Sequence, residues 1–383
     1  MANIFLSPAK IISGENALKN AVNEFTAMGR KALIVTDSVM EKLGNLNKVE
    51  TVLKESGISY STYAKVNSEP TDVIVLDGVE QFKKDKCDFL VALGGGSPID
   101  TMKAIGMILS GGGTPVDYFN KVVTGKLPSM AAIPTTAGTG SEATQFTIIT
   151  DTKSNVKMLL KGPSLMPNLA VIDPQFTMTA PRKVTSSTGL DALCHAVESF
   201  TSRKAQPLSD TFALSAVKKI FKYLPICFNE GNNVEARKQM SIAALEAGIA
   251  FNNSSVTIIH GMSRPIGALF HVPHGLSNAM LLKECLSFVL DGAYERFAVL
   301  GRAINAADEY DTDEEASKKF LSAVEKICTE LEIPTLKEFG VDKDEFLKVI
   351  DKMSSDAMDS GSPQNTRKTV TLEDIKGIYK KLW

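Results

Sequence analysis

The sequence predicts a two-domain protein in which an α/β domain with a parallel sheet, residues 1–180, precedes an all-α domain, residues 181–383. The chain has 383 residues, more than the roughly 100 to 200 residues of an ordinary domain. In its first part, short β-branched runs alternate with helical patterns, as in strands joined by crossover helices. After about Pro181 the pattern changes to long segments with helical spacing. The boundary is expected in the polar, proline-containing stretch 173–181.

Four continuous apolar runs in the first domain are predicted to be strands that are covered on both faces. Gly-rich turns follow two of them. The second domain has no strand candidate of comparable strength, and three of its segments have clear helical spacing. The predicted strands are residues 31–36, 88–93, 130–134 and 169–172, and the predicted helices include residues 210–223, 235–251 and 313–331.

The composition indicates a folded globular protein, with 44% hydrophobic and 22% charged residues. Because 42 Lys and Arg oppose 44 Asp and Glu, for a formal charge of -2, neither nucleic acid nor an anionic membrane is an expected partner. No apolar stretch reaches the roughly 18 residues of a membrane-spanning helix, and no export signal is visible. Five cysteines without close pairing suit a reducing compartment, so we expect a cytoplasmic protein.

A turn of three glycines, Gly94, Gly95 and Gly96, leaves a predicted strand and opens a predicted helix. The helix is expected to have Ser97 as its N-cap, with a proline at the first helical position and Asp100 three residues after the cap. Bare backbone amides at a helix start favour a phosphate, so a pyrophosphate is the expected ligand. The motif lacks the G-x-G-x-x-G spacing, and a tight turn without a ligand is the alternative.

A second turn, residues 134–142, also follows a predicted strand and is rich in hydroxyl groups and glycine. Thr135, Thr136 and Thr139 could bind phosphate oxygens or a ribose, although a structural Ser/Thr turn has the same composition. Asp37 follows another predicted strand, where its carboxylate could bind an adenosine ribose and repel a 2'-phosphate. That arrangement favours NAD over NADP, unless Asp37 only caps a turn or helix.

All four histidines of the sequence lie in the second domain. Asp191 and His195 are four residues apart, so both project from the same face of a helix. His260 and His274 bracket a segment with two prolines and could converge on them from neighbouring turns. One carboxylate and three imidazoles suit a divalent metal ion. The alternatives are core histidines and a simple helix salt bridge.

The metal expected in such a set is iron(II). Four protein ligands complete the tetrahedral sphere that zinc(II) prefers, whereas iron(II) more readily accepts a substrate oxygen as a fifth ligand. Zinc(II) and manganese(II) stay as alternatives.

Together these motifs resemble the iron-containing (group III) alcohol dehydrogenases, which include lactaldehyde reductase, 1,3-propanediol dehydrogenase and butanol dehydrogenase. The resemblance implies a dehydroquinate synthase-like fold with an N-terminal nucleotide-binding domain and a helical, metal-binding catalytic domain. It also implies a site in the cleft between them and assembly into homodimers or larger homo-oligomers. It covers nearly the whole chain through residues 5–18, 94–100, 135–142, 191–198 and 260–275.

The resemblance assigns roles to individual residues. Those that match the family's metal ligands are Asp191, His195, His260 and His274. Those that match positions around the dinucleotide are Asp37, Gly95, Gly96, Ser97, Asp100, Thr135, Thr136, Thr139 and Lys157.

Two departures from the family pattern concern the chemistry. Arg264 stands where many relatives carry a further histidine, one helical turn after His260, so proton relay through that position is in doubt. This fixed cation could instead bind a carboxylate, sulfonate or phosphonate on the substrate, or form a local salt bridge. Glu69 stands where relatives often have Asn or Asp before a proline, which puts that cofactor contact in doubt. His271 could carry a proton or only pack.

The expected reaction is the interconversion of a short-chain aldehyde and its primary alcohol, with the metal ion as Lewis acid and NAD(H) as hydride carrier. The aldehyde could have an anionic tail, as sulfoacetaldehyde does, or be neutral. The alternatives from other classes are a sugar-phosphate cyclase or lyase that uses NAD transiently, and a noncatalytic nucleotide-binding protein. Neither nucleic acid nor a membrane is expected among the partners.

Overall fold

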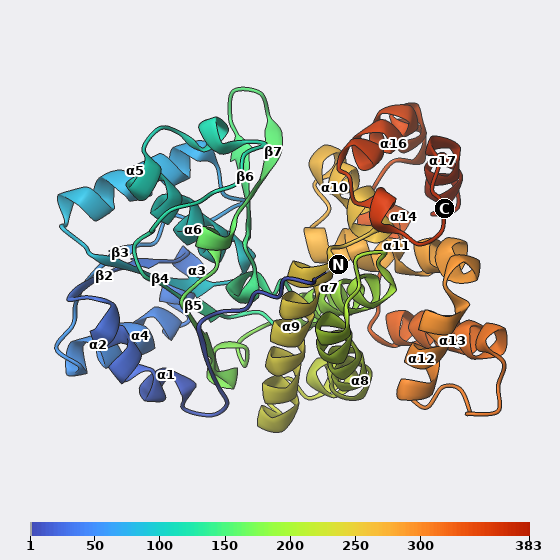
Figure 1. Ribbon diagram of the computed structural model, residues 1–383, viewed down its shortest axis with the longest axis horizontal. Coiled ribbons are helices and arrows are strands. Elements are labelled where there is room, and N and C mark those ends of the chain that lie inside the picture. Colours follow the sequence, from blue (N-terminus) through green and yellow to red (C-terminus); the bar gives the residue numbers. More distant parts are fainter. Residues whose placement is uncertain (1) are drawn as a thin grey trace. The chain divides into compact units, whose positions relative to one another are not determined.

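The computed structural model describes residues 2–383, which form two compact units (Figure 1). The first comprises Leu6–Ala180, and the second comprises residues 2–5 together with Pro181–Trp383. The N-terminal residues belong to the second unit because the Ile4 carbonyl accepts a hydrogen bond from Gln206 Nε2 and because Phe5 stacks on Phe212.

The α/β unit is built on a six-stranded sheet in the order β1-β8-β5-β4-β2-β3, in which all neighbouring strands are parallel. The buried central strands match the apolar runs of the sequence, so the predicted parallel sheet is confirmed. The strands are β1 (Lys10–Ser13), β2 (Lys31–Val35), β3 (Ser59–Tyr63), β4 (Phe89–Gly94), β5 (Met130–Pro134) and β8 (Leu169–Ile172).

Helices cover both faces of this sheet (Figure 1). On β2, Ala32 and Ile34 pack with α1, α2 and α4, whereas Leu33 and Val35 pack with α5 and α6 on the opposite face. Successive residues of a strand point to opposite faces, which is why a doubly covered strand is apolar throughout. The helices are α1 (Ala17–Asn20), α2 (Val22–Met28), α3 (Ser38–Lys42), α4 (Asn45–Glu55), α5 (Asp72–Lys84) and α6 (Gly96–Gly111).

The apolar-run criterion missed four strands. β1 and β3 lie at the edges of the sheet, and β3 has the largely polar sequence SYSTY. β6 (Phe146–Asp151) and β7 (Val156–Lys161) form a separate antiparallel hairpin in which buried and more exposed residues alternate. Strands covered on one face, or lying at an edge, lack the continuous apolar run that marks a central strand.

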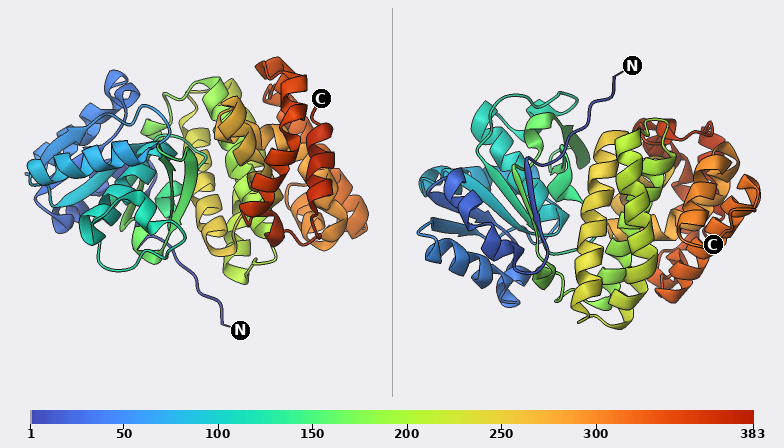
Figure 2. Two further views of the ribbon diagram at one scale, coloured as in Figure 1. Left: turned by 90° about the horizontal axis from the view of Figure 1, so that it is seen from above. Right: turned by 60° about the horizontal axis from the view of Figure 1, so that its bottom comes forward.

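The second unit is helical, as predicted. Its longest helices, α7, α8 and α9, pack side by side (Figure 2). Two of them extend the predicted helical segments 210–223 and 235–251 by several residues. The helices are α7 (Arg182–Thr201), α8 (Pro207–Asn229), α9 (Val234–Ser254), α10 (Ile258–Phe270), α11 (His274–Val289), α12 (Tyr294–Ala303), α13 (Asp313–Glu330), α14 (Leu336–Phe339), α15 (Lys343–Lys348), α16 (Ile350–Asp359) and α17 (Leu372–Lys380).

Within residues 2–383, no single helix has the length and apolar composition needed to cross a bilayer. By length and composition alone, α9 and α10 pass that test only as a pair, with a bend of 105° between them.

Candidate functional site

The first group of predicted site residues lies along the carboxyl edge of the parallel sheet. Asp37 follows β2, the glycine turn follows β4, and the hydroxyl-rich turn follows β5, and these three strands are neighbours in the order β5-β4-β2. The chain order reverses between β2 and β4, because β3 lies outside β2 whereas β5 and β8 continue on the other side of β4. Ligands of doubly wound sheets bind at the carboxyl ends of strands at such a switch point.

The helix after the glycine turn begins earlier than the sequence predicted. Helix α6 starts at Gly96 with Gly95 as its N-cap, so the prediction of Ser97 as the cap is wrong and Ser97 lies in the first turn. A glycine has no side chain with which to cap, and no side-chain hydrogen bond caps this end. The first amides of α6 therefore lack the partners that a Ser or Asp cap would supply, which suits a phosphate group better than the predicted cap does.

The two turns lie against each other. The Thr135 amide donates to the Gly94 carbonyl at 3.0 Å. A Cβ added to Gly95 would lie 3.4 Å from Thr136 Oγ1, and one added to Gly96 would lie 3.2 Å from Thr139 Cγ2. Thr136 Oγ1 is buried without a hydrogen-bond partner among residues 2–383. Glycine backbone and an unpartnered hydroxyl thus face each other, an arrangement that fits the phosphates or ribose of a dinucleotide.

Asp37 caps helix α3. Its Oδ1 accepts from the amides of Val39 and Met40 at 2.8 and 3.0 Å. A helix cap was the alternative to ribose binding in the sequence analysis. The second carboxylate oxygen takes no part in the cap, so capping leaves one oxygen for another partner. Lys157, on β7, forms an ion pair with Glu69 at 2.6 Å. Its charge is therefore already compensated by the residue that departs from the family pattern.

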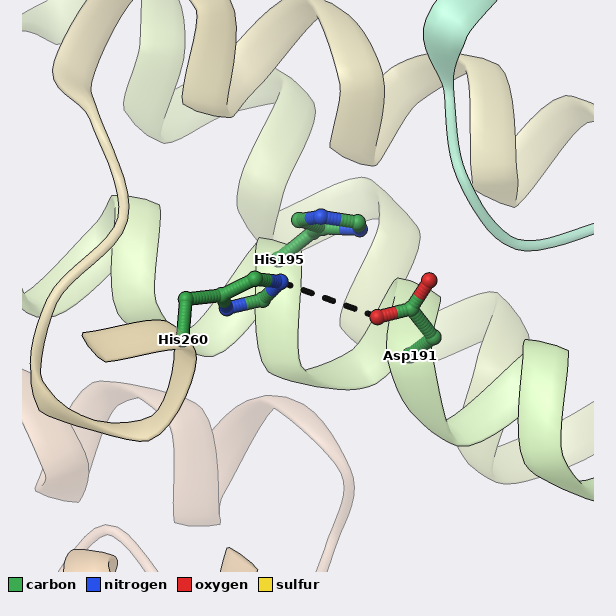
Figure 3. Close-up of side chains that lie close together, drawn as sticks. All are labelled: Asp191, His195 and His260. Atoms are coloured by element: carbon green, nitrogen blue, oxygen red, sulfur yellow. Dashed lines mark ion pairs between the residues drawn. The ribbon is translucent and has the colours of Figure 1, made fainter. Parts of the chain in front are cut away.

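The second group of predicted residues lies in the helical unit (Figure 3). Asp191, His195 and His260 each offer one ligand atom, and these atoms lie within 4.8 Å of one another. The two from α7 are brought together by their i,i+4 spacing, and His260 joins them from α10. All three are at least 95% buried. His274, the first residue of α11, places its Nε2 3.9 Å from Asp191 Oδ1, with its side chain 40% exposed.

Electrostatics within this group favour one anion beside a neutral imidazole. Burial would raise the pKa of Asp191, but the neighbouring histidines outweigh it and hold that pKa below its usual value. Burial lowers the pKa of His195 to about 3, so its ring is neutral and carries a lone pair. Burial would also lower the pKa of His260, but the Glu198 and Asp191 carboxylates raise it to about 9.

Two residues beside this group were not singled out from the sequence. Glu198, one helical turn after His195, binds His260 Nδ1 through one oxygen and accepts from Thr257 Oγ1 and the Ile259 amide, at 2.8 and 2.7 Å, through the other. It therefore orients the imidazole and also caps the start of α10. The signal was present in its i,i+3 spacing from His195, but its partners come from another helix.

Asn278, one turn into α11, is the other. Its Nδ2 donates to Asp191 Oδ1 at 2.7 Å and lies 3.1 Å from His260 Nε2 and 3.3 Å from His274 Nε2. A single amide thus touches three members of the predicted ligand set, which places those three side chains around one point.

Arg264 lies one turn after His260 on α10 and is partly exposed. Its one hydrogen bond is a weak one, from Nη1 to Ser362 Oγ at 3.4 Å, and no carboxylate of residues 2–383 forms an ion pair with it. The surrounding burial lowers its pKa. His271 ends α10 in the left-handed conformation, with φ of 55°, and its side chain is exposed.

The donors suit a divalent ion. A carboxylate held ionised, and an imidazole whose outer nitrogen is bound by a second carboxylate, as His260 Nδ1 is by Glu198, are ligands that iron(II) and zinc(II) accept. His195 Nδ1 is buried without a hydrogen-bond partner among residues 2–383, and a ring nitrogen in that position is costly to bury unless the ring has another role.

Known proteins resemble the chain over its full length. Residues 8–174 match the family described as iron-containing alcohol dehydrogenase, and residues 185–383 match its C-terminal region. A choline dehydrogenase of Bacillus subtilis is 36% identical over 382 residues, 98% of this chain and 94% of the relative.

Solved structures resemble it equally completely. A 1,3-propanediol oxidoreductase superposes with a TM-score of 0.97 at 31% identity, over 100% of both chains. A sulfoacetaldehyde reductase from Bifidobacterium kashiwanohense, solved in complex with NAD+, gives a TM-score of 0.89 at 28% identity, over 100% of this chain and 99% of the other. The chain accordingly belongs to the iron-containing alcohol dehydrogenase family of oxidoreductases, which act on alcohols.

Proposed function

We propose that the protein is a metal- and NAD(H)-dependent aldehyde reductase that interconverts a short-chain aldehyde carrying an anionic tail and the corresponding primary alcohol. The observation that carries the anionic tail is the Arg264 guanidinium, a partly exposed charge whose one hydrogen-bond partner among residues 2–383 is the neutral hydroxyl of Ser362, at 3.4 Å. A substrate sulfonate or carboxylate would complete its hydrogen bonding.

The α/β domain, residues 1–180, is proposed to bind the dinucleotide at the carboxyl edge of its sheet. The proposed cofactor-binding residues are Asp37, Gly94, Gly95, Gly96, Ser97, Asp100, Thr135, Thr136, Thr139 and Lys157. The free oxygen of Asp37 would bind the ribose of NAD and repel the extra phosphate of NADP. The sulfoacetaldehyde reductase that this chain resembles was solved with NAD+, which supports the same preference.

The helical domain, residues 181–383, is proposed to hold Fe(II), or else Zn(II) or Mn(II), on Asp191, His195, His260 and His274. When bound, the ion would serve as a Lewis acid for a carbonyl oxygen, and NADH would supply the hydride. Asp191 lowers the positive charge of the site, and Glu198 fixes the proton on the outer nitrogen of His260. His271, exposed at the end of α10, is the proposed group for proton exchange with water.

Arg264 is proposed to select the substrate. A partly buried guanidinium without an ion-pair partner is costly, and bidentate pairing with an anion offsets that cost. The same charge disfavours choline, a cation, although a choline dehydrogenase is among the relatives of this chain. A neutral diol or alcohol is the second candidate, because the chain also resembles a 1,3-propanediol oxidoreductase. Such a substrate would offer Arg264 no negative charge.

The test compares sulfoacetaldehyde and succinic semialdehyde with propanal and betaine aldehyde, in wild type, Arg264→Ala and Arg264→Lys. Loss of a charge-assisted hydrogen bond is expected to lower kcat/KM for the two anionic aldehydes about tenfold or more in the alanine variant. Turnover of propanal should change little, and lysine, which keeps the charge but not the fork, should restore only part of the loss. Equal losses on neutral and anionic aldehydes would contradict the assignment of Arg264.

A further inference from the structure

A small cavity lies at the start of α10, in the helical unit. Its volume open to water is about 10 Å³, which is about the size at which a polar cavity holds one water molecule. Apolar side chains line part of its wall, and the polar residues that line the rest are Thr201, Thr257, Thr366 and Arg367. These four residues decide what the cavity can bind.

Two of the four residues have a buried donor that lacks a hydrogen-bond partner. Thr366 is 3% exposed, and its Oγ1 has no partner among residues 2–383. Within the same part of the chain, Nε of Arg367 is also buried without a partner. Buried polar atoms of native proteins are nearly always hydrogen-bonded, to protein or to ordered water, so both donors indicate a ligand in the cavity.

The other two polar residues can still accept hydrogen bonds. Thr257 Oγ1 donates its proton to Glu198 Oε1 at 2.8 Å. Thr201 Oγ1 donates its proton to the Val197 carbonyl, also at 2.8 Å. A hydroxyl has one proton but two lone pairs, so both oxygens keep the capacity to accept. The cavity therefore offers two donors and two acceptors, and one water molecule, which accepts twice and donates twice, complements them.

The charges around the cavity favour a neutral ligand over an ion. Arg367 is a cation, but its Nη1 already pairs with Glu295 Oε1 at 3.1 Å. The buried carboxylate of Glu198 lies next to Thr257, to which it is hydrogen-bonded. An anion in the cavity would be repelled by Glu198, and a cation would be repelled by Arg367. Water meets neither objection.

Hydrogen bonds to the backbone hold the residues on this side of the cavity in place. The Arg203 amide donates to the Asn365 carbonyl at 2.7 Å, and Arg203 Nε donates to the Thr366 carbonyl at 2.5 Å. Asn365 Nδ2 donates to Ser255 Oγ and to the Val256 carbonyl, both at 3.0 Å. These bonds tie Thr366 to the end of α7 and to the turn before α10, so its hydroxyl is fixed where it is.

A water molecule in the cavity would lie at the end of a chain of hydrogen bonds that leads to the proposed metal site. It would donate to Thr257 Oγ1, which donates to one oxygen of Glu198. The other oxygen of Glu198 binds His260 Nδ1. Hydrogen bonds in such a chain polarise and strengthen one another. The water would thus hold the Thr257 hydroxyl in the orientation in which it donates to Glu198.

We propose that this cavity is a binding site for one ordered water molecule, and that Thr366 and Arg367 are positioning residues that act through this water and Thr257 on His260. The water accepts from Thr366 Oγ1 and Arg367 Nε and donates to the hydroxyl oxygens of Thr201 and Thr257. The positioning role rests on the proposed function, because it takes His260 as a metal ligand. The water site itself does not depend on that function.

The water site is tested by high-resolution crystal structures of the full-length wild type and of Thr366→Val. Valine has nearly the shape of threonine but no hydroxyl, so it removes one of the two donors. We expect one water in the wild-type cavity, within hydrogen-bond distance of Thr366 Oγ1 and Arg367 Nε. In Thr366→Val this water should be weaker or missing. A wild-type cavity without water would overturn the proposal.

The positioning role is tested by the affinity of metal-stripped protein for Co(II) or Zn(II), measured by competition with a chelator. Loss of one hydrogen bond to the water is expected to raise the Kd of the ion about threefold to tenfold in Thr366→Val. Thr366→Ser keeps the hydroxyl and should stay near wild type. Arg367→Lys keeps a positive charge near Glu295 but has no N–H group in place of Nε, so its Kd should rise as in Thr366→Val. The melting temperature of each variant separates loss of fold from loss of metal.

A double-mutant cycle tests the path through Thr257. Thr257→Val removes the link to Glu198, so adding Thr366→Val to it should cause no further rise in the Kd of the ion. Ser354→Ala is the control, because it removes another buried hydroxyl of the helical unit, one that donates to the Ile350 carbonyl at 2.7 Å. Its metal affinity should equal that of wild type. If Thr257→Val does not fold, Thr366→Val against Thr366→Ser still decides the matter.

The outcomes are distinct. Equal metal affinities in Thr366→Val and Thr366→Ser, multiplicative losses in the double variant, or an equal loss in Ser354→Ala would each overturn the positioning role while the proposed function stands. A wild-type protein that binds neither Co(II) nor Zn(II) would overturn the proposed metal site, and the positioning role with it.

Discussion

Replacing Glu198 by Gln tests whether the helical unit binds a metal ion as the geometry indicates. Glutamine keeps the size of the side chain and one carbonyl oxygen, so it can still accept from Thr257 Oγ1 and from the Ile259 amide. Its NH₂ group would face His260 Nδ1, which now binds a carboxylate oxygen. Because an amide donates there, the ring proton must move to Nε2, the atom 3.6 Å from Asp191 Oδ1.

The size of the effect follows from what is lost. The substitution removes one charge-assisted hydrogen bond in a fully buried position, which contributes about 1.5–3 kcal/mol. It also places a proton on the nitrogen whose lone pair the ion would use. We therefore expect the dissociation constant of the ion to rise about 10- to 100-fold, the range found for groups that orient metal-bound histidines. Asp191 and His195 keep their positions, so binding should weaken rather than vanish.

The assay is a competition titration of metal-stripped protein with Co(II) or Zn(II) against a chromophoric chelator. Glu246→Gln is the matched control, because Glu246 is also a largely buried carboxylate of the helical unit but pairs with Lys219, at 2.9 Å, outside the site. Its metal affinity should equal that of wild type. A folded Glu198→Gln variant with wild-type metal affinity would refute the role given to Glu198. An equal loss of metal affinity in both variants would show that the substitutions only destabilise the helical unit.

Three further predictions concern other residues. Asp37→Asn keeps a capping oxygen for α3 but removes the negative charge, so the melting temperature should hold while the ratio of the NADPH and NADH dissociation constants falls. His274→Ala leaves the three buried donors in place, so elemental analysis should find metal bound more weakly but still present, whereas Asp191→Ala should lose it. Burial raises the pKa of Glu142 to about 7, so its contribution to stability is present at low pH and is lost as the pH rises through that value. Glu142→Gln should therefore raise the melting temperature relative to wild type more at pH 8 than at pH 5.

Strands that are buried on both faces could be predicted from the sequence, whereas strands that are buried on one face could not. β5 and β8 are buried at every position, and the apolar runs predicted their bounds without error. The hairpin β6–β7 alternates between buried and more exposed residues, and such alternation over six residues is hard to separate from a polar loop. The start of α6 was predicted two residues too late, because Ser97 and Pro98 have the sequence pattern of an N-cap and a first helical residue, whereas the N-cap is Gly95.

Within the candidate site, the sequence predicted which residues of one helix lie together, but it did not predict contacts between residues of different helices. Asp191 and His195 are neighbours by helical geometry, so their pairing is visible in the sequence. Asn278 contacts Asp191 only because α11 packs on α7, across 87 residues of chain. The sequence does not reveal the burial of Lys103, because a lysine on a helix is usually exposed. Only the packing of the segment 141–146 over Lys103 gives its ammonium group four acceptors.

The free backbone amides at the start of a helix serve the proposed cofactor site at α6 and the proposed metal site at α10. The start of α6 has a glycine N-cap and no side-chain partner, so its positive end and amides are left for a ligand with negative oxygens. At the start of α10, the amides bind the carboxylate of Glu198, which lies on α7. Burial would raise the pKa of Glu198, but His260 and the hydrogen bonds from Thr257 and Ile259 lower it. Because the Glu198 carboxylate occupies the start of α10, that helix end cannot bind an anionic ligand, and the carboxylate is a fixed acceptor for His260 Nδ1. The difference between a helix end that binds a ligand and one that orients a metal ligand thus lies in whether another helix delivers an acid to it.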